Sequence, residues 1–303
     1  MRALKSDLYE LTARFARALP DLRGKGRIAQ WLGDRGVAGT WDIPMRGGYR
    51  MLVPRSSHQT WLSAFTGTYD EDCFQIALEF IEPGSIVVDV GASLGFWTVQ
   101  LAARSNAALI LAFEPVEANR RIIACNLAVN ELASRARVEH YGLGAARRHF
   151  PAYIEKGGVG NAGVGYVVGF DCTTIEVRPL DSVKFAGKCS FVKMDVEGYE
   201  MDVLAGGETF VAKHRPVIFG EFSMHNWPER CIPPDAVERW AETHDYGVTE
   251  IQRQRPRWFA PSRSTAEARD EGERRSDGYV LLRPLRRCDE HRREESVIAS
   301  SAS

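Results

Sequence analysis

Two acidic residues in the middle of the chain stand where a parallel sheet would present them to a ligand. Residues 86–90 form an apolar run that contains Asp89, and Gly91 and Gly95 follow it closely enough for a tight turn into a helix. A second apolar run is followed by Glu114, 25 residues after Asp89. Glycines let the backbone approach a bound molecule, and a second carboxylate accepts hydrogen bonds from ribose hydroxyls. The pattern therefore predicts a site for a nucleotide or nucleoside cofactor.

The spacing of the glycines distinguishes two classes of cofactor. Dinucleotide-binding folds use G-x-G-x-x-G, in which the N-terminus of the following helix holds a pyrophosphate. Here the order is D-x-G-x-x-x-G, and a carboxylate just before the first glycine would repel a pyrophosphate. S-adenosylmethionine carries a sulfonium and an ammonium group and no phosphate, so Asp89 favours a methyl donor over NAD. A strand-to-helix turn with a purely structural role is the alternative.

The composition is that of an ordinary globular protein. The 303 residues are 44% hydrophobic and 26% charged, and the formal net charge is -1. A charge so close to zero gives no electrostatic reason to expect nucleic acid as a partner. No apolar run reaches the roughly 18 residues of a membrane helix. The six cysteines have no C-x-x-C spacing, so we expect free thiols in the cytoplasm and no metal site.

Apolar runs and helical patterns alternate from residue 85 onward. Candidate strands lie at 86–90, 109–113, 137–142, 190–195 and 216–222. Candidate helices lie near 95–104, 116–131, 199–213 and 234–244. This alternation predicts an α/β fold with a mostly parallel sheet and helices on both faces. Two late strands, 247–251 and 278–282, could form an antiparallel pair that closes the sheet.

Further motifs follow the glycine turn in a fixed order. They are VVDVGASLGF (87–96), FEPVEAN (113–119), NLAVN (126–130), RPLDSV (178–183) and VKMDVEGYE (192–200). The series resembles the FkbM family of S-adenosylmethionine-dependent methyltransferases over about residues 68–223, and the K-x-D-x-E-G-x-E segment is its most specific part. The resemblance implies a class I methyltransferase (Rossmann-like) fold. It also implies methyl transfer, usually to oxygen, on hydroxyls of polyketides, sugars or lipid-linked glycans.

With this resemblance, the chain divides into three predicted parts. Residues 1–67 form an N-terminal extension, with helical periodicity over 4–33 and a β-hairpin over 40–53. Residues 68–285 form the methyltransferase domain, in which 252–277 is a polar, solvated insertion. Residues 286–303 form a charged tail that we expect to be disordered.

The cofactor is expected to lie against the turn and the two strand ends. Asp89 would orient the turn or meet the ammonium group through water, and Glu114 would hold the ribose by two charge-assisted hydrogen bonds. Ser93 stands where the family commonly has asparagine, so the detail of binding would differ. The predicted cofactor-binding residues are Asp89, Gly91, Ser93, Gly95, Glu114, Asn119 and Gly142. The structural alternatives are capping glycines, an exposed Glu114, and a surface or helix-cap Asn119.

The acceptor side is expected at the ends of the next two strands. Asp195 ends a buried strand, and ligands of open parallel sheets bind at such carboxyl ends. Asp195 or Glu197 could take the acceptor proton, bind a substrate hydroxyl or ligate a metal, and capping of the next helix is the structural alternative. Glu221 and His225 could line the acceptor pocket. Lys193, on the same strand face as Asp195, could pair with a carboxylate.

We therefore expect an O-methyltransferase that works by in-line transfer to a hydroxyl of a sugar, a glycan or glycolipid, or a polyketide-type product. A positioned base is needed because an aliphatic hydroxyl is a poor acid. A divalent metal held by Asp195 and Glu221 could lower the hydroxyl pKa, but no ligand spacing indicates one. The alternatives are a catalytically silent cofactor-binding protein on the same fold and, less favoured, an NAD-dependent oxidoreductase. The glycine-rich segment 157–165 could be a flap over the acceptor or a surface hairpin.

Overall fold

The computed structural model describes residues 2–19, 25–33, 38–55, 58–154, 162–164, 171–222, 227–251 and 278–285. Before the main sheet come α1 (Arg2–Ala18), α2 (Lys25–Gly33), β1 (Thr40–Pro44), β2 (Arg50–Pro54), α3 (His58–Thr66) and α4 (Glu71–Leu78). The first half of the sheet region holds β3 (Ile86–Val90), α5 (Phe96–Arg104), β4 (Leu109–Phe113), α6 (Glu117–Val129), η1 (Ala133–Arg135) and β5 (Ala136–Glu139). A second group of strands is β6 (Gly142–Leu143), β7 (Arg148–Ile154), β8 (Ala162–Val164) and β9 (Asp171–Arg178). The chain then forms η2 (Leu180–Ser182), β10 (Cys189–Met194), α7 (Glu200–Ala205), α8 (Glu208–His214), β11 (Val217–Phe222), η4 (Pro228–Arg230), α9 (Ala236–Thr243), β12 (Tyr246–Ile251) and β13 (Gly278–Pro284).

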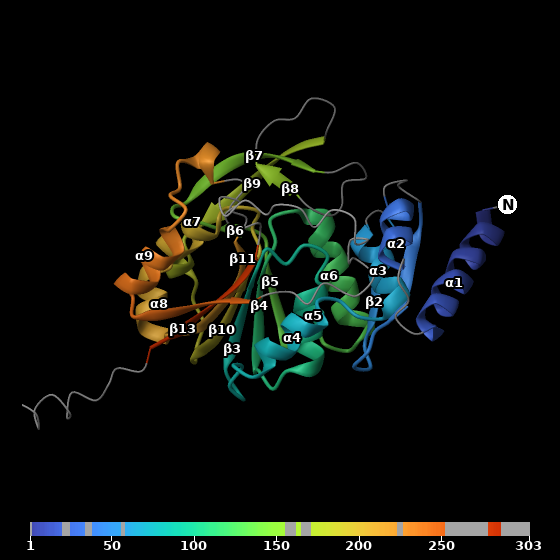
Figure 1. Ribbon diagram of the computed structural model, residues 1–303, viewed down its shortest axis with the longest axis horizontal. Coiled ribbons are helices and arrows are strands. Elements are labelled where there is room, and N and C mark those ends of the chain that lie inside the picture. The colour runs from blue at the N-terminus through green and yellow to red at the C-terminus, as the bar shows by residue number, and fades with distance from the viewer. Residues whose placement is uncertain are drawn as a thin grey trace, which may run out of the picture.

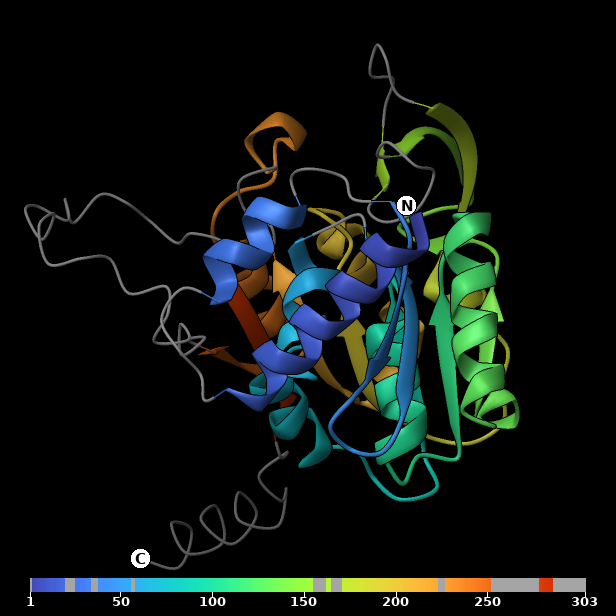
Figure 2. The same cartoon turned by 90° about the vertical axis from the view of Figure 1, so that its right-hand side faces the viewer.

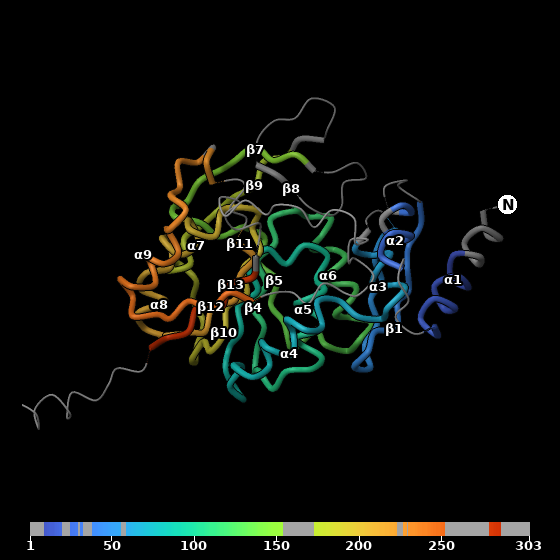
Figure 3. The backbone as a smooth tube through the Cα atoms, in the orientation of Figure 1, coloured from blue at the N-terminus to red at the C-terminus, as the bar shows by residue number. Residues whose placement is uncertain are grey.

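A seven-stranded sheet forms the centre of the molecule (Figures 1 and 3). Its order is β12-β13-β11-β10-β3-β4-β5, and the neighbours from β11 to β5 are parallel. Only β13 runs antiparallel, and it pairs with both β11 and β12. The predicted mostly parallel sheet is confirmed, and so is the antiparallel pair that closes it.

Helices cover both faces of this sheet, which explains why its inner strands are buried and mostly apolar (Figure 1). All five residues of β3 are buried, and alternate residues enter two different hydrophobic clusters. The cluster on one face includes side chains of α4, α5, α6 and the N-terminal elements. The cluster on the other face includes side chains of α7, α8 and α9. None of the described helices is long and apolar enough to span a membrane.

The structure differs from the predicted elements in two places. The predicted helix 199–213 is divided into α7 and α8 at Gly206 and Gly207, whose backbone angles are not helical. A Cβ on Gly206 would lie 2.0 Å from the carbonyl oxygen of Gly144. The predicted strand 137–142 is replaced by two short strands, β5 and β6. The order β6-β9-β7-β8 defines a second sheet that the sequence analysis did not predict. It lies above the carboxyl ends of the main sheet (Figure 1).

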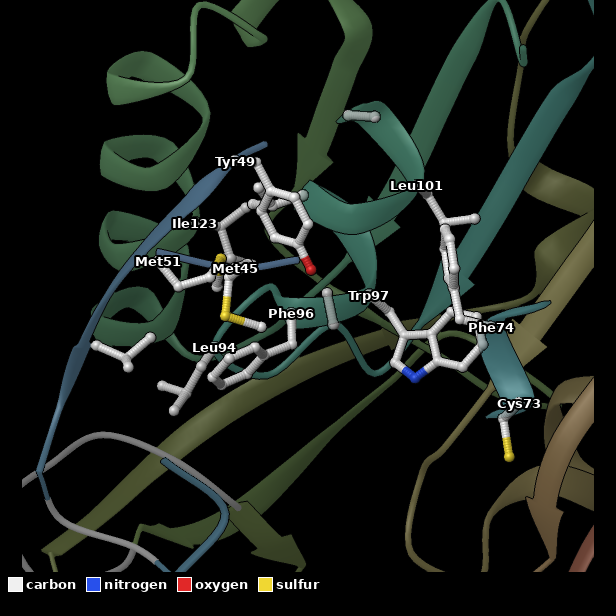
Figure 4. Close-up of a cluster of buried hydrophobic side chains, with 14 of the residues drawn as sticks. Met45, Tyr49, Met51, Cys73, Phe74, Leu94, Phe96, Trp97, Leu101 and Ile123 are labelled. Carbon is white, nitrogen blue, oxygen red and sulfur yellow. The ribbon is translucent and has the colours of Figure 1, made fainter. Parts of the chain in front are cut away.

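The N-terminal elements pack beside α5 and α6 (Figure 2). The predicted hairpin is confirmed by the antiparallel pair β1–β2. Figure 4 shows Met45, Tyr49 and Met51 of this hairpin beside Leu94, Phe96 and Ile123, all within one buried cluster. The hairpin therefore packs directly behind the glycine turn.

Asn126 of α6 and Asn130, which caps the end of that helix, bind the free edge of β2 as a neighbouring strand would. Asn126 accepts from the amide of Leu52 at 2.6 Å and donates to its carbonyl at 3.1 Å. Asn130 does the same for Arg50, at 2.7 Å in both directions. One helical turn therefore matches the two-residue repeat of the strand. These residues are the two asparagines of the NLAVN motif.

The division into three parts remains a prediction. Residues 40–54 share one hydrophobic cluster with α4, α5 and the main sheet. The predicted insertion 252–277, the tail from 286 to 303 and most of the glycine-rich segment 157–165 lie outside the described residues.

Candidate active site

A cavity of about 240 Å³ opens at the carboxyl ends of β3, β4 and β10 and is also lined by residues of the small sheet. Its lining contains seven of the predicted site residues, namely Gly91, Ser93, Glu114, Asn119, Gly142, Asp195 and Glu197. Asp89, Gly95 and Glu221 are not part of the lining, and His225 lies outside the described residues. The cofactor and acceptor residues predicted from separate motifs therefore meet in one place.

The glycine turn is shaped by close contact with the end of β10. Gly91 has φ +76°, and a Cβ at this position would lie 2.0 Å from the carbonyl oxygen of Asp195. The amides of Gly91 and Ala92 both donate to the carbonyl of Phe113, each at 3.1 Å. Ser93 also has a positive φ, of +49°. Only glycine fits at position 91, because both the space and the dihedral angle exclude a side chain.

Glu114 is buried, with 4% of its surface exposed, and its carboxylate ties the turn to the start of α6. Its Oε2 accepts from the amide of Ser93, and its Oε1 accepts from the amide of Val116, both at 2.8 Å. The Asn119 side-chain amide donates to the same Oε1 at 3.3 Å. Burial raises the pKa of Glu114 to about 7, although the amides of Val116 and Ser93 act in the opposite direction.

These three hydrogen bonds limit what Glu114 can offer a ribose. A carboxylate has about four acceptor positions, so roughly one remains, on Oε2. A second hydrogen bond from the ribose to Glu114 requires the Asn119 side-chain amide to stop donating to Oε1. Asn119 is buried and held at this carboxylate, so it is not a surface residue. Its direct contact with the cofactor stays a prediction.

Asp89 and Gly95 support the turn from below. Asp89 is fully buried; its Oδ2 accepts from the Thr98 hydroxyl at 2.6 Å, and its Oδ1 lies 3.4 Å from the Lys193 ammonium. Gly95 precedes α5 with φ +84°, and a Cβ there would lie 2.8 Å from Ile123. Asp89 therefore lies beneath the turn, and both of the roles expected of it, orienting the turn and meeting an ammonium group through water, stay predictions.

The turn after β10 presents two acids and is held by a third. Asp195 is half-buried and Glu197 is exposed, with φ +52°. Glu200 is fully buried, and its Oε1 accepts from the amide of Gly198 at 3.0 Å and, more weakly, from that of Val196 at 3.4 Å. The carboxylate that caps this turn therefore belongs to Glu200, which leaves Asp195 facing the cavity.

The small sheet supplies a wall that the sequence analysis missed. Arg148 and Phe150 of β7 face the cavity together with Ile175 and Val177 of β9. Phe150 stands opposite Ile175, and Arg148 opposite Val177, in the antiparallel register. The only signal in the sequence was a short alternation around Ile175 and Val177, and polar residues interrupt it.

Tyr199 and Asp202 of the α7 region close another side of the cavity. The guanidinium of Arg230 lies 3.7 Å from the centre of the Tyr199 ring and forms an ion pair with Asp202. Arg230 also donates to the carbonyl of Gly198. The η4 segment thus braces the turn that carries Asp195.

Glu221 lies on β11, half-buried and opposite Tyr279 of β13, outside this lining. Within the described ranges, no three histidine, cysteine, aspartate or glutamate side chains group in a way that could hold a metal ion.

A family model described as the methyltransferase FkbM domain matches residues 89–248, more than half of the chain. The chain belongs to the FkbM methyltransferase family. The match covers the glycine turn, Glu114, Asp195 and the small sheet. The resemblance inferred from the sequence is thereby confirmed.

Individual relatives are distant. The AMB antimetabolite synthetase AmbE of Pseudomonas aeruginosa is 32% identical over 84 residues, which are 26% of this chain and 4% of the synthetase. The crystal structure of methyltransferase FkbM from Methylobacillus flagellatus is 16% identical, with a TM-score of 0.43, over 75% of this chain and 54% of that one. A SAM-dependent O-methyltransferase from Thermotoga maritima is 13% identical, with a TM-score of 0.41, over 73% and 67%. This FkbM-family chain thus spans a small part of the synthetase and about half of the first structure.

The contact at Gly91 yields a matched pair of substitutions. Gly84 has nearly the same φ, +74°, but a Cβ there would meet nothing within 4 Å. We expect Gly84→Ala to cost about 1–2 kcal/mol of unfolding free energy, from the dihedral angle alone. Gly91→Ala should cost about 1–3 kcal/mol more, because the Asp195 carbonyl must move. Equal losses in urea unfolding would show that the close approach is not a constraint.

The buried Glu200 predicts a pH-dependent stability. Burial raises the pKa of Glu200 to about 7, so the folded protein keeps a proton that the unfolded chain releases above its ordinary pKa of 4.5. Stability from this group is therefore present below about pH 4.5 and is lost as the pH rises through 7. Glu200→Gln stays neutral, so its stability relative to the parent should rise between pH 4 and pH 8.

The exposed Glu242→Gln on α9 is the control for this prediction. Urea unfolding at both pH values measures the difference. A Glu200→Gln variant whose relative stability is the same at pH 4 and pH 8 would contradict the buried, protonated state.

Proposed function

We propose that this protein transfers the methyl group of S-adenosylmethionine to a hydroxyl of a sugar, a glycan or glycolipid, or a polyketide-type product. The observation that carries the proposal is that Asp195, Glu114 and the glycine turn at Gly91 line the same cavity. A cofactor bound at Glu114 would therefore lie close to an acceptor bound at Asp195. The likeness to a segment of an antimetabolite synthetase supports a small-molecule acceptor.

The charge of the lining supports a cationic cofactor. Among its described residues are four carboxyl groups and a single arginine, namely Glu114, Asp195, Glu197, Asp202 and Arg148. This excess of carboxyl groups suits a sulfonium and an ammonium group, whereas it does not suit a pyrophosphate. Phe150, Ile175 and Val177 offer an apolar wall to a base, and the open position on Glu114 offers an acceptor to a ribose. These features disfavour NAD.

When bound, S-adenosylmethionine supplies an electrophilic methyl group with a good, neutral leaving group. The protein then has two tasks, to align the acceptor oxygen and to remove its proton. Alignment can contribute roughly 7–11 kcal/mol in the best cases. We assign the hydroxyl proton to Asp195, with Glu197 as the other candidate in the lining, because Glu114 and Glu200 are both held by backbone amides. A positioned base contributes about 10²–10⁴-fold in rate.

Binding of the cofactor is tested by calorimetry with S-adenosylmethionine, S-adenosylhomocysteine and NAD. We expect micromolar affinity for the first two and none for NAD. Glu114→Ala removes a charge-assisted bond and the anchor of the Ser93 amide, so it should lose about 1.5–3 kcal/mol of binding. Glu117→Ala, an exposed acid on α6, is the control. A folded Glu114→Ala variant with parental affinity would remove the ribose assignment.

Turnover separates the enzyme from a silent binding protein on the same fold. With a panel of sugar and polyketide hydroxyls as acceptors, Asp195→Asn should lower the rate about 10²–10⁴-fold. Its affinity for S-adenosylhomocysteine should stay within a few-fold of the parent. Near-normal turnover in the variant would end the role of Asp195 as base. Loss of parental activity on chelation, restored by divalent ion, would point to a metal instead.

A further inference from the structure

Lys193 is a buried charge that the proposed chemistry leaves unused. It lies on β10 directly opposite Asp89 of β3, in the middle of the sheet, and only 3% of its surface is exposed. A lone ammonium so deeply buried would be strongly unfavourable, so its partners determine why it is there.

The ammonium group has three N–H donors, and three groups of the described residues lie within 4 Å of it. It donates to the carbonyl of Gly91 at 3.1 Å, and it lies 3.4 Å from Asp89 Oδ1 and 3.7 Å from Asp195 Oδ2. Burial by itself would lower the pKa of Lys193, but attraction to Asp89 and Asp195 outweighs it, and the pKa is raised. Lys193 is therefore a cation in the folded protein.

The three neighbours of Lys193 belong to different parts of the site. Asp89 is fully buried and is also bound by Thr98, so it is the fixed end of the group. Gly91 begins the turn on the cofactor side. Asp195 is half-buried and faces the cavity. One side chain thus joins the turn to the acceptor carboxylate, just where their backbones touch.

We propose that Lys193 is a positioning residue that fastens the Gly91 turn to Asp195 and so sets the acceptor carboxylate against the cofactor. The effect on the cofactor rests on the proposed function, whereas the effect on the turn does not. Lys193 makes no contact with reacting atoms; it acts through the Gly91 carbonyl and the Asp195 carboxylate.

The competing explanation is that Lys193 only neutralises Asp89. A pure counter-ion can be removed together with its partner at little cost, because replacing a whole buried ion pair by neutral groups is often harmless. A positioning residue cannot be removed in this way, because its contacts with Gly91 and Asp195 are lost in both the single and the double variant. The double variant Lys193→Met/Asp89→Asn therefore distinguishes the two roles.

The experiment compares Lys193→Met, the double variant and Thr98→Val. Thr98 is the control, because it is buried and its hydroxyl bonds the same Asp89, but it makes no hydrogen bond to Gly91 or Asp195 in the described part of the chain. The first readout is backbone hydrogen exchange of the ligand-free protein at residues 91–95 and 195–199. The second is affinity for S-adenosylhomocysteine, measured by calorimetry.

We expect Lys193→Met to lower the melting temperature and the double variant to regain most of it. Both should show at least tenfold faster exchange in the two segments and at least tenfold weaker affinity, whereas Thr98→Val should show neither change. If Lys193→Met is too unstable to study, hydrogen exchange of the ligand-free double variant gives the answer, because Asp89 is itself a predicted cofactor contact and the affinity of that variant is not decisive.

Recovery of exchange protection and affinity in the double variant would overturn the positioning role and leave a counter-ion. Parental exchange and affinity in Lys193→Met would overturn it as well. Absence of S-adenosylhomocysteine binding in the parent protein would instead refute the proposed function, and hydrogen exchange would still decide the role of Lys193.

Discussion

The close approach of the backbone just after β3 and just after β10 is the constraint on which the site depends. At residue 91 there is no room for a Cβ, because the Asp195 carbonyl would lie 2.0 Å from it. The parallel register pairs Val90 with Met194, and the amide of Asp195 donates to the carbonyl of Val90 at 3.1 Å. The Gly91 turn and the backbone of Asp195 thus form one unit, positioned by the sheet itself.

Around this unit, carboxylates are held by backbone amides. Glu114 binds the amides of Ser93 and Val116, and Glu200 binds that of Gly198. Burial raises the pKa of both acids to about 7, so each retains its proton to a higher pH than an ordinary glutamate does. No backbone amide of the described residues binds the Asp195 carboxylate, and Asp195 is the most exposed of the three acids. Hydrogen bonds from backbone amides therefore distinguish the two glutamates, which are held in place, from Asp195, which faces the cavity.

Local sequence patterns predicted the main sheet and the core of the site because the determinants are short-range. Gly91, Glu114 and Asp195 each stand at the end of an apolar run, and parallel strand ends meet at one edge. The small sheet was missed because its face toward the cavity arises only when β7 and β9 pair across a long connection. The role of Asn126 was equally hidden, since it depends on a strand 74 residues away.

A crystal structure of the full chain with S-adenosylhomocysteine is the most direct test of this account. We predict a ribose hydroxyl within hydrogen-bonding distance of Glu114 Oε2, the base against the wall of Phe150, Ile175 and Val177, and the sulfur facing Asp195. A ligand bound outside this cavity, or a ribose that does not touch Glu114, would contradict it.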